Sequence, residues 1–388
     1  MREQTNNKAT MEMCRQILTT LVKIDTCQPE GNEEKLVDAI LQMLPDDITY
    51  KKIEHAPGRA SLVVKVEGET PKGGIAFVGH IDTVACSNLD SWIHPPHEAV
   101  VEGDILYGRG SSDMKGGDTA MIITLKNLLS GGKKPKTPVY FCFTADEESK
   151  GMGICAVVKD GCINDIEEMV ICEPSDEKIG ICEKGALWLH VSVQGKASHA
   201  SRPDLGVNAV DYAIEFSNRL KAAAEGKEEH SILGSTTVSV TRFNGGIMTN
   251  IIPSEAELEL DIRTVPGTSH ERILELAHTI CREMSEKSPY IHMAIQVLNN
   301  RPALETDLNS PFVRNIMKAA EEAGISTEPK GLYFYTDASQ VIPKINVPFV
   351  IAGPGDDAMA HCMNECISLS SVARYAEMYS NYIEQYYI

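Results

Sequence analysis

The sequence contains no uninterrupted apolar run of about 18 residues, the length that crosses a bilayer, and its first residues, from Met1 on, are polar and charged, unlike a signal peptide. We therefore expect a cytoplasmic protein with no membrane partner. Basic side chains are also scarce, because 36 Lys and Arg stand against 55 Asp and Glu and leave a formal net charge of −19. Nucleic acids bind basic surfaces, so we exclude a nucleic acid as the main partner.

The cysteine pattern lacks any Cys-x-x-Cys pair. The 11 cysteines are scattered along 388 residues as an odd number with no compact framework, which predicts reduced thiols in a reducing compartment. Cys142 and Cys172 lie inside apolar runs, where cysteine behaves as a small hydrophobic residue. Cys362 and Cys366 stand close together, but no second pair of this kind would complete a tetrahedral zinc site.

Residues 1–183 alternate short apolar runs with amphipathic stretches, a pattern typical of an α/β domain with a mostly parallel sheet flanked by helices. The apolar runs predict buried strands at 74–79, 138–143 and 169–172. Apolar residues at spacings of three and four predict a helix over 33–44. A further apolar run at 347–352 predicts that the C-terminal part completes the sheet, so we expect one domain from residues 1–183 and 300–388.

The pattern changes between residues 184 and 299, where apolar and charged residues alternate strictly, as in Glu255–Arg263. A period of two with one polar face indicates an antiparallel sheet with one solvated side. The predicted elements are strand 186–194, helix 207–223, strand 236–243, strand 255–264, helix 269–286 and strand 290–297. This β-α-β-β-α-β order predicts an inserted ferredoxin-like α+β domain.

Potential metal ligands follow every predicted strand of the first domain. In open α/β sheets, ligand sites lie at the carboxyl ends of the strands. The candidates are His80 and Asp82 after strand 74–79, Glu147 and Glu148 after strand 138–143, Glu173 after strand 169–172, His361 beyond strand 347–352, and Asp113 in a glycine-rich loop. A single histidine after a strand is usually a hydrogen-bonded loop residue, and an acidic pair is usually solvated. The coincidence across four strand ends favours a metal site.

Two histidines and several carboxylates suit zinc, but they exceed the ligands that one tetrahedral ion needs. Two ions about 3.5–4 Å apart that share a carboxylate would polarise one water molecule and one scissile carbonyl. Adjacent Glu147 and Glu148 cannot both easily bind the same ion. We therefore expect one of them to bind metal while the other acts as the general base.

Five motifs in this order resemble the M20 family of metallopeptidases and deacylases. They are His80–Val84, Gly108–Gly117, Asp146–Glu148, the segment around Glu173 and His361–Glu365. The likeness covers essentially the whole chain. It implies two divalent ions, zinc with cobalt or manganese as substitutes, and a cis peptide bond after Asp113. In the roles it implies, His80 and Glu173 bind one ion, Glu148 and His361 bind the other, Asp113 bridges them, Glu147 is the general base, and Asp82 accepts the second ring N–H of His80.

The inserted domain resembles the family's lid and dimerisation domain through the segments Gly195–Pro203 and Gly206–Ala209. The resemblance implies that His199 reaches the active site of the partner in a homodimer. It also places Asn250 and Arg263 at the carboxylate of the substrate. For Arg263, which stands at the end of a polar strand face, a plain surface position is the less favoured alternative. An uncovered sheet edge in this domain would invite pairing between two copies.

These features predict a zinc-dependent amidohydrolase that cleaves the amide bond of an N-acyl amino acid, with acetyl or succinyl as the acyl group. A dipeptidase or carboxypeptidase acting on a short peptide is the alternative within the family. The segment Tyr333–Gln340 matches no single substrate type, so the substrate is open. The alternative from another class is a non-catalytic carboxylate-binding protein, which a missing ligand or base would favour, and none is missing.

Overall fold

The computed structural model describes residues 2–388, so Met1 lies outside the described residues, and the chain divides into two compact units. The first unit extends to Ile181 and resumes at Thr306–Lys330 and Thr336–Ile388, while the second comprises Cys182–Glu305 and Gly331–Tyr335. The second unit is thus longer at both ends than the expected 184–299. The added residues include an antiparallel pairing of Leu304 and Glu305 with Glu183 and Cys182.

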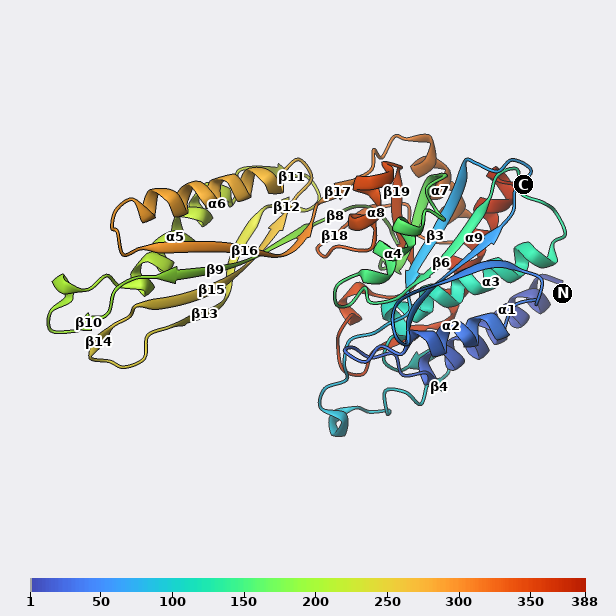
Figure 1. The fold of residues 1–388 in the computed structure, drawn as a ribbon. Coiled ribbons are helices and arrows are strands. Elements are labelled where there is room, and N and C mark those ends of the chain that lie inside the picture. The colour runs from blue at the N-terminus through green and yellow to red at the C-terminus, as the bar shows by residue number, and fades with distance from the viewer. Residues whose placement is uncertain (1) are drawn as a thin grey trace. The chain divides into compact units, whose positions relative to one another are not determined.

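The first unit is built on a mixed sheet with the order β1-β2-β6-β3-β7-β19-β8 (Figure 1). Its four central strands, β6, β3, β7 and β19, are parallel to one another, and the strands on either side are antiparallel. The strands are β1 (Thr49–Ala56), β2 (Arg59–Val66), β3 (Gly74–His80), β6 (Val139–Thr144), β7 (Ile166–Pro174), β8 (Ile179–Glu183) and β19 (Phe349–Gly353). The short strands β17 (Leu304–Glu305) and β18 (Pro329–Leu332) pair with β8.

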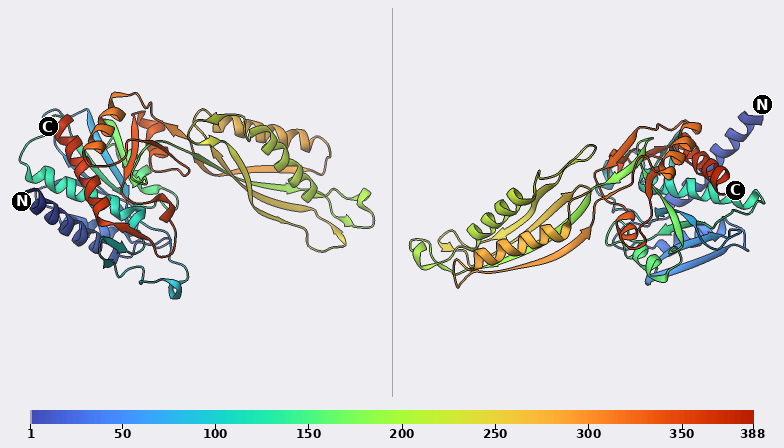
Figure 2. Two further views of the ribbon diagram at one scale, coloured as in Figure 1. Left: turned by 180° about the vertical axis from the view of Figure 1, so that it is seen from behind. Right: turned by 90° about the horizontal axis from the view of Figure 1, so that it is seen from above.

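Helices cover both sides of this sheet, with α4 on one side and α3 and α9 on the other (Figures 1 and 2). Phe77 of β3 lies 5.4 Å from Phe141 of β6 and 5.1 Å from Tyr379 of α9, measured between ring centroids. These rings join sheet and helix in one apolar core. The helices are α1 (Arg2–Lys23), α2 (Glu33–Gln42), α3 (Gly116–Ser130), α4 (Met152–Asp160), α7 (Pro311–Glu322), α8 (Ala338–Ile345) and α9 (Leu369–Tyr386).

A small sheet of order β20-β5-β4 lies apart from the main one in the first unit. Its strands are β4 (Val100–Glu102), β5 (Ile105–Tyr107) and β20 (Cys366–Ser368). Cys366 pairs with Tyr107, which brings the residues before β20 beside the glycine-rich loop that follows β5.

The second unit is a four-stranded antiparallel sheet of order β13-β15-β9-β16 with α5 and α6 on one face (Figure 1). Alternate apolar residues of β15, such as Leu258 and Leu260, are buried against both helices, while the charged residues between them face the other way. The elements are β9 (Gly185–Gln194), α5 (Ala209–Ala224), β13 (Thr237–Gly245), β15 (Glu255–Thr264), α6 (His270–Ser285) and β16 (His292–Arg301). Two short strand pairs accompany them: β10 (Ser198–His199) pairs with β14 (Ile251–Ile252), and β11 (Glu229–His230) pairs with β12 (Gly234–Ser235).

The α/β fold class is confirmed, and every strand and helix named from the sequence is present within a few residues. The pattern did not reveal β1, β2 or β8, which extend the sheet on both sides with antiparallel strands. Among residues 2–388, no helix is long and apolar enough to cross a membrane. The cytoplasmic location stays a prediction.

Candidate metal centre

The central strands deliver the predicted ligands to one edge of the first unit. β3 ends at His80, β6 ends just before Glu147 and Glu148, and β7 contains Glu173 near its end. Since β6, β3 and β7 are parallel neighbours, their carboxyl ends lie side by side. The exposed His361 follows β19, the fourth parallel strand, and lies in the same unit.

Asp113 lies between the two histidines. Its Oδ1 is 3.0 Å from His80 Nε2, and its Oδ2 is 3.5 Å from His361 Nε2. On the first side, Glu173 Oε1 is 3.4 Å from the same His80 nitrogen, and on the second side, Glu148 Oε2 is 2.8 Å from His361 Nε2. One carboxylate therefore faces two imidazoles, each with a further glutamate beside it.

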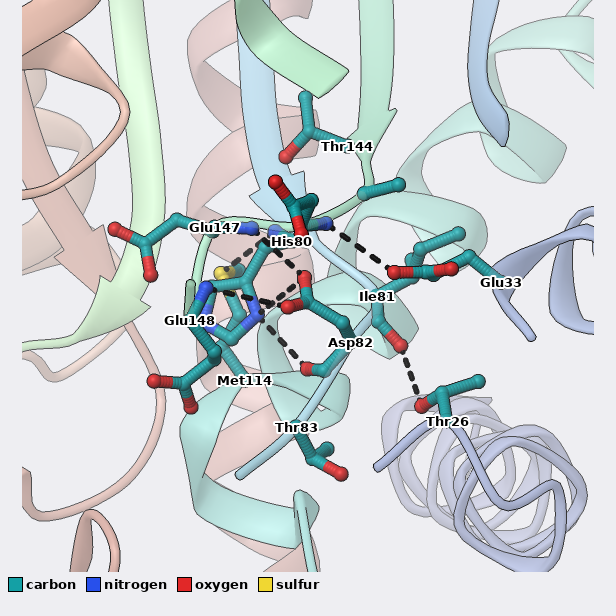
Figure 3. Close-up of polar contacts among 12 residues, drawn as sticks. Thr26, Glu33, His80, Ile81, Asp82, Thr83, Met114, Thr144, Glu147 and Glu148 are labelled. Carbon is teal, nitrogen blue, oxygen red and sulfur yellow. Dashed lines mark hydrogen bonds and ion pairs between the residues drawn. The ribbon is translucent and has the colours of Figure 1, made fainter. Parts of the chain in front are cut away.

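The ring of His80 is oriented by Asp82, as expected, but through a different atom (Figure 3). His80 Nδ1 lies 2.9 Å from the backbone carbonyl oxygen of Asp82, and the nearest carboxylate oxygen of Asp82 is 3.7 Å away. A carbonyl only accepts, so Nδ1 donates its proton to it, and Nε2 is the ring nitrogen that faces Asp113.

The carboxylate of Asp82 instead holds the acidic pair in place (Figure 3). It accepts the backbone N–H groups of Glu147 at 3.1 Å and Glu148 at 3.2 Å, and the side-chain amide of Gln28 at 2.7 Å. Glu147 also lies close enough to His80 and Glu173 to share an ion with them. The geometry alone thus leaves Glu147 free to serve as a base or as a ligand.

The carboxylates of the centre carry unfavourable charge. Burial raises the pKa of Glu147 and of Glu173 well above their ordinary value, and burial together with Asp113 raises the pKa of Glu148. Burial alone would lower the pKa of His80, but Glu173 and Asp113 raise it well above its ordinary value. Ionisation of all these carboxyl groups at once is therefore unfavourable unless further positive charge lies beside them.

The donor set fits divalent ions of the zinc class. Glu148 Oε1 is buried and has no hydrogen-bond partner among the described residues, although such atoms nearly always have one. Two groups of ligand atoms, each lying within 4.8 Å of one another, share His80: one contains Glu147 and Glu173, and the other contains Asp113 and Glu148. Imidazole nitrogens and carboxylate oxygens are ligands that zinc accepts, so the residues fit two such ions.

Glu365, the last residue of the motif His361–Glu365, supports the loop that carries Asp113. Its place in the sequence did not reveal this role. Its buried carboxylate accepts hydrogen bonds from the Arg109 guanidinium at 2.7 Å and from the backbone N–H groups of Gly110 at 2.9 Å, Ser112 at 2.8 Å and Asp113 at 3.0 Å. This side chain fixes the loop that carries Asp113. The Asp113–Met114 peptide bond is cis, as the resemblance implied.

A second supporting network holds the loop of the acidic pair. Arg59 donates to the buried Glu33 at 2.5 and 2.7 Å and to Asp146 at 3.0 Å. The backbone N–H of Asp146 also contacts Glu33. Asp146 has a φ of 66°, an uncommon conformation for a residue with a side chain. These ion pairs hold the turn that directs Glu147 and Glu148.

The remaining predicted residues belong to the second unit. His199 and Asn250 lie near each other, because His199 of β10 pairs with Ile251 of β14, and both side chains are exposed. His199 Nδ1 accepts the backbone N–H of Ser201, which leaves Nε2 with the ring proton. Arg263 makes two bonds to Asp261 on its own strand, at 2.9 and 3.1 Å.

We predict that Glu365→Gln lowers the free energy of unfolding by about 3–5 kcal/mol, because it leaves the buried Arg109 without its charged partner. It should also weaken zinc binding about 10–100-fold, since the Asp113 loop loses its anchor. Urea denaturation of the metal-free protein and zinc titration measure the two effects. Glu377→Gln, on an exposed part of α9, is the control and should change neither. Wild-type stability and zinc affinity in Glu365→Gln would refute this role.

The chain is similar over most of its length to curated relatives and solved structures. A probable succinyl-diaminopimelate desuccinylase of Staphylococcus epidermidis is 28% identical over 404 residues, which cover 95% of this chain and 96% of the relative. A tripeptidase of Staphylococcus aureus has a TM-score of 0.77 at 21% identity and covers 97% of this chain and 99% of its own. A Bacillus subtilis protein described as a dinuclear metal binding peptidase of the M20 family has a TM-score of 0.72 at 17% identity, with 97% and 99% covered.

The model of the peptidase family M20/M25/M40 matches residues 76–385. This span contains His80, Asp113, the acidic pair, Glu173 and His361, together with the entire second unit. The resemblance seen in the sequence motifs is thereby confirmed. The chain belongs to the peptidase family M20/M25/M40, and it is a hydrolase of the M20 type.

Proposed function

We propose that this hydrolase is a zinc-dependent amidohydrolase that cleaves an N-acyl amino acid bearing an acetyl or succinyl group. The observation that carries the proposal is the position of Asp113, whose two oxygens face His80 at 3.0 Å and His361 at 3.5 Å. A carboxylate that faces two imidazoles from its two oxygens is suited to lie between two metal ions of a hydrolytic site. Similarity to a probable succinyl-diaminopimelate desuccinylase supports the acyl amino acid as substrate class.

In this proposal, His80 and Glu173 hold one ion, Glu148 and His361 hold the other, and Asp113 bridges them. Zinc suits this donor set, and cobalt or manganese would substitute for it. When bound, the ions would polarise the amide carbonyl and lower the pKa of a water molecule.

Glu147 is the proposed general base. Asp82 fixes its backbone N–H, so the carboxylate is held at the edge of the ligand cluster. The carboxylate takes a proton from water as the water oxygen bonds to the amide carbon. It then returns this proton to the nitrogen as the carbon–nitrogen bond breaks, so that a carboxylic acid and an amine are released.

The second unit would supply residues that bind and orient the substrate. The protonated Nε2 of His199 is a hydrogen-bond donor suited to the oxygen that gains negative charge during attack. Asn250, beside it, would bind the substrate carboxylate. Arg263 offers a planar fork suited to a carboxylate, but it would have to release Asp261 to use it.

A dipeptidase or carboxypeptidase is the second candidate, because the fold is also that of a tripeptidase. The deciding experiment measures hydrolysis of matched N-acetyl, N-succinyl and dipeptide substrates by protein loaded with zinc, cobalt or manganese. We expect the highest kcat/KM with an N-acyl amino acid and loss of turnover after chelation. A preference for dipeptides would favour the second candidate. Full activity in demonstrably metal-free protein would refute both.

For Glu147→Gln, we predict a fall in turnover of about 10²–10⁴-fold with both metals retained, because the amide cannot accept the proton. Metal content per chain and turnover are measured on the same samples. Glu54→Gln on the exposed part of β1 is the control. If Glu147→Gln loses one metal, Glu147 is a ligand and not the base; if its turnover is near normal, it has neither role.

We also propose that the protein forms a homodimer through the second unit. β13 is an edge strand of the sheet, and the segment from β13 into the following turn exposes large apolar side chains. Exposed fractions are 44% at Val240, 38% at Phe243, 82% at Ile247 and 63% at Met248. An unpaired apolar edge favours pairing with a second copy about a two-fold axis.

If His199 acts on the partner's centre, a mixture of His199→Ala and Glu147→Gln protomers should recover partial activity. Each mixed dimer then has one centre with both an intact base and an intact His199. Subunit exchange is followed by native mass spectrometry, and turnover is compared with that of each variant alone. Absence of recovery despite proven exchange, or a fully active monomer, would contradict the shared site.

A further inference from the structure

Two cysteines and a histidine converge in the first unit, outside the cluster of acidic ligands. Cys27 follows α1 and pairs with Thr83 in an isolated parallel bridge, and Cys86 lies three residues beyond Thr83. His97 comes from the loop before β4. Although Cys27 and Cys86 are 59 residues apart, the structure brings both thiols to the same imidazole.

The three ligand atoms form a nearly equilateral triangle. The two Sγ atoms are 3.8 Å apart, and His97 Nε2 lies 3.8 Å from Cys27 Sγ and 3.9 Å from Cys86 Sγ. In tetrahedral zinc sites with Zn–S of about 2.3 Å and Zn–N of about 2.0 Å, sulfur atoms lie about 3.8 Å apart and sulfur and nitrogen about 3.5 Å apart. The triangle therefore has the dimensions of three corners of such a tetrahedron.

The hydrogen bonding of His97 aims the correct nitrogen at the sulfurs. Nδ1 lies 3.4 Å from the backbone carbonyl oxygen of Val22, which can only accept a proton. This contact places the ring proton on Nδ1 and leaves the lone pair of Nε2 toward the two thiols. A carbonyl on the second ring nitrogen is the usual companion of a metal-binding histidine.

The cluster supplies anionic groups for a cation, and Cys86 ionises more readily than Cys27. The hydrogen bond between the two thiols raises the pKa of Cys27 and lowers that of Cys86 to about 7, to which the nearby Arg109 also contributes. Asp25 adds a carboxylate, with Oδ1 3.7 Å from His97 Nε2. Contact with Cys27 raises the pKa of His97, and a metal ion would replace that proton.

We propose that Cys27, Cys86 and His97 form a third metal site, separate from the acidic centre, which binds one zinc-class ion with Asp25 or water as fourth ligand. A disulfide between the two cysteines is the competing use of the same pair. It would need the sulfurs to move from 3.8 Å to about 2.0 Å, and it gives no role to the aligned His97.

Such an ion would tie the segment after α1 to the loop after β3. Gln28, next to Cys27, donates to the Asp82 carboxylate that fixes the acidic pair. The third site would thus stabilise a support of the acidic centre without contributing a ligand to it.

Cobalt titration of the reduced, metal-free protein tests the proposal. Thiolate ligands give cobalt an intense near-ultraviolet charge-transfer absorption, whereas the acidic centre contains no sulfur. We expect the intensity of this absorption at saturation to correspond to one thiolate-bound cobalt per chain, in addition to the cobalt held by the acidic centre, and the absorption to disappear when zinc is added. The double variant Cys27→Ser/Cys86→Ser should lose the absorption and one bound metal per chain. Cys162→Ser, a half-buried thiol elsewhere in the first unit, is the control and should keep both.

The result is independent of the proposed activity, because Glu147→Gln should show the same absorption as the wild type. Absence of the absorption in fully reduced wild-type protein, or its persistence in the double variant, would overturn the site. If the double variant does not fold, alkylation of the wild type by iodoacetamide decides. Zinc should protect Cys27 and Cys86, read by mass spectrometry, and not Cys162. Equal alkylation with and without zinc would refute the proposal.

Discussion

Carboxylates that are buried beside one another repel, and each also loses the stabilisation that water would give its charge. Glu147 and Glu148 follow β6 and Glu173 lies near the end of β7, and these two strands run parallel to β3 on either side of it, so the three glutamates meet at one edge of the sheet. The histidines on either side of Asp113 offset part of the charge. Divalent ions would offset the rest, so affinity for metal follows from the electrostatic cost of the arrangement.

The loops that carry these carboxylates are held by hydrogen bonds to side chains from distant parts of the chain. The Glu365 carboxylate accepts backbone N–H groups of the Asp113 loop, and the Asp82 carboxylate accepts the backbone N–H groups of the acidic pair. Arg59 pairs with Glu33 and Asp146 in the turn before them. Acidic side chains therefore have two uses here: some face the centre, and others accept the N–H groups that would otherwise leave those loops unrestrained.

Sequence patterns predicted most of the fold because burial imposes a period. β3 is a continuous apolar run because both faces of the strand are buried. β15 alternates strictly between apolar and polar residues because only one of its faces is buried. β1 was missed because it is exposed along most of its length and shows no such period. His80, Glu147, Glu148 and Glu173 were predictable as candidate ligands for a related reason, since they stand at or just after the ends of buried runs whose strand ends must meet.

The sequence by itself determined the two-unit α/β architecture, the family and the candidate ligand residues, because these depend on local periodicity and on motifs of contiguous residues. Only the tertiary structure decided which atoms meet. It showed that His80 donates to the Asp82 carbonyl and not to the Asp82 carboxylate, and that Glu365 anchors the Asp113 loop. It also brought Cys27 to Cys86. Most of these contacts join residues that are far apart in the sequence and meet only when separate segments pack together. The periodicity of a segment predicts which of its faces is buried, but not which side chains of other segments come within hydrogen-bonding distance.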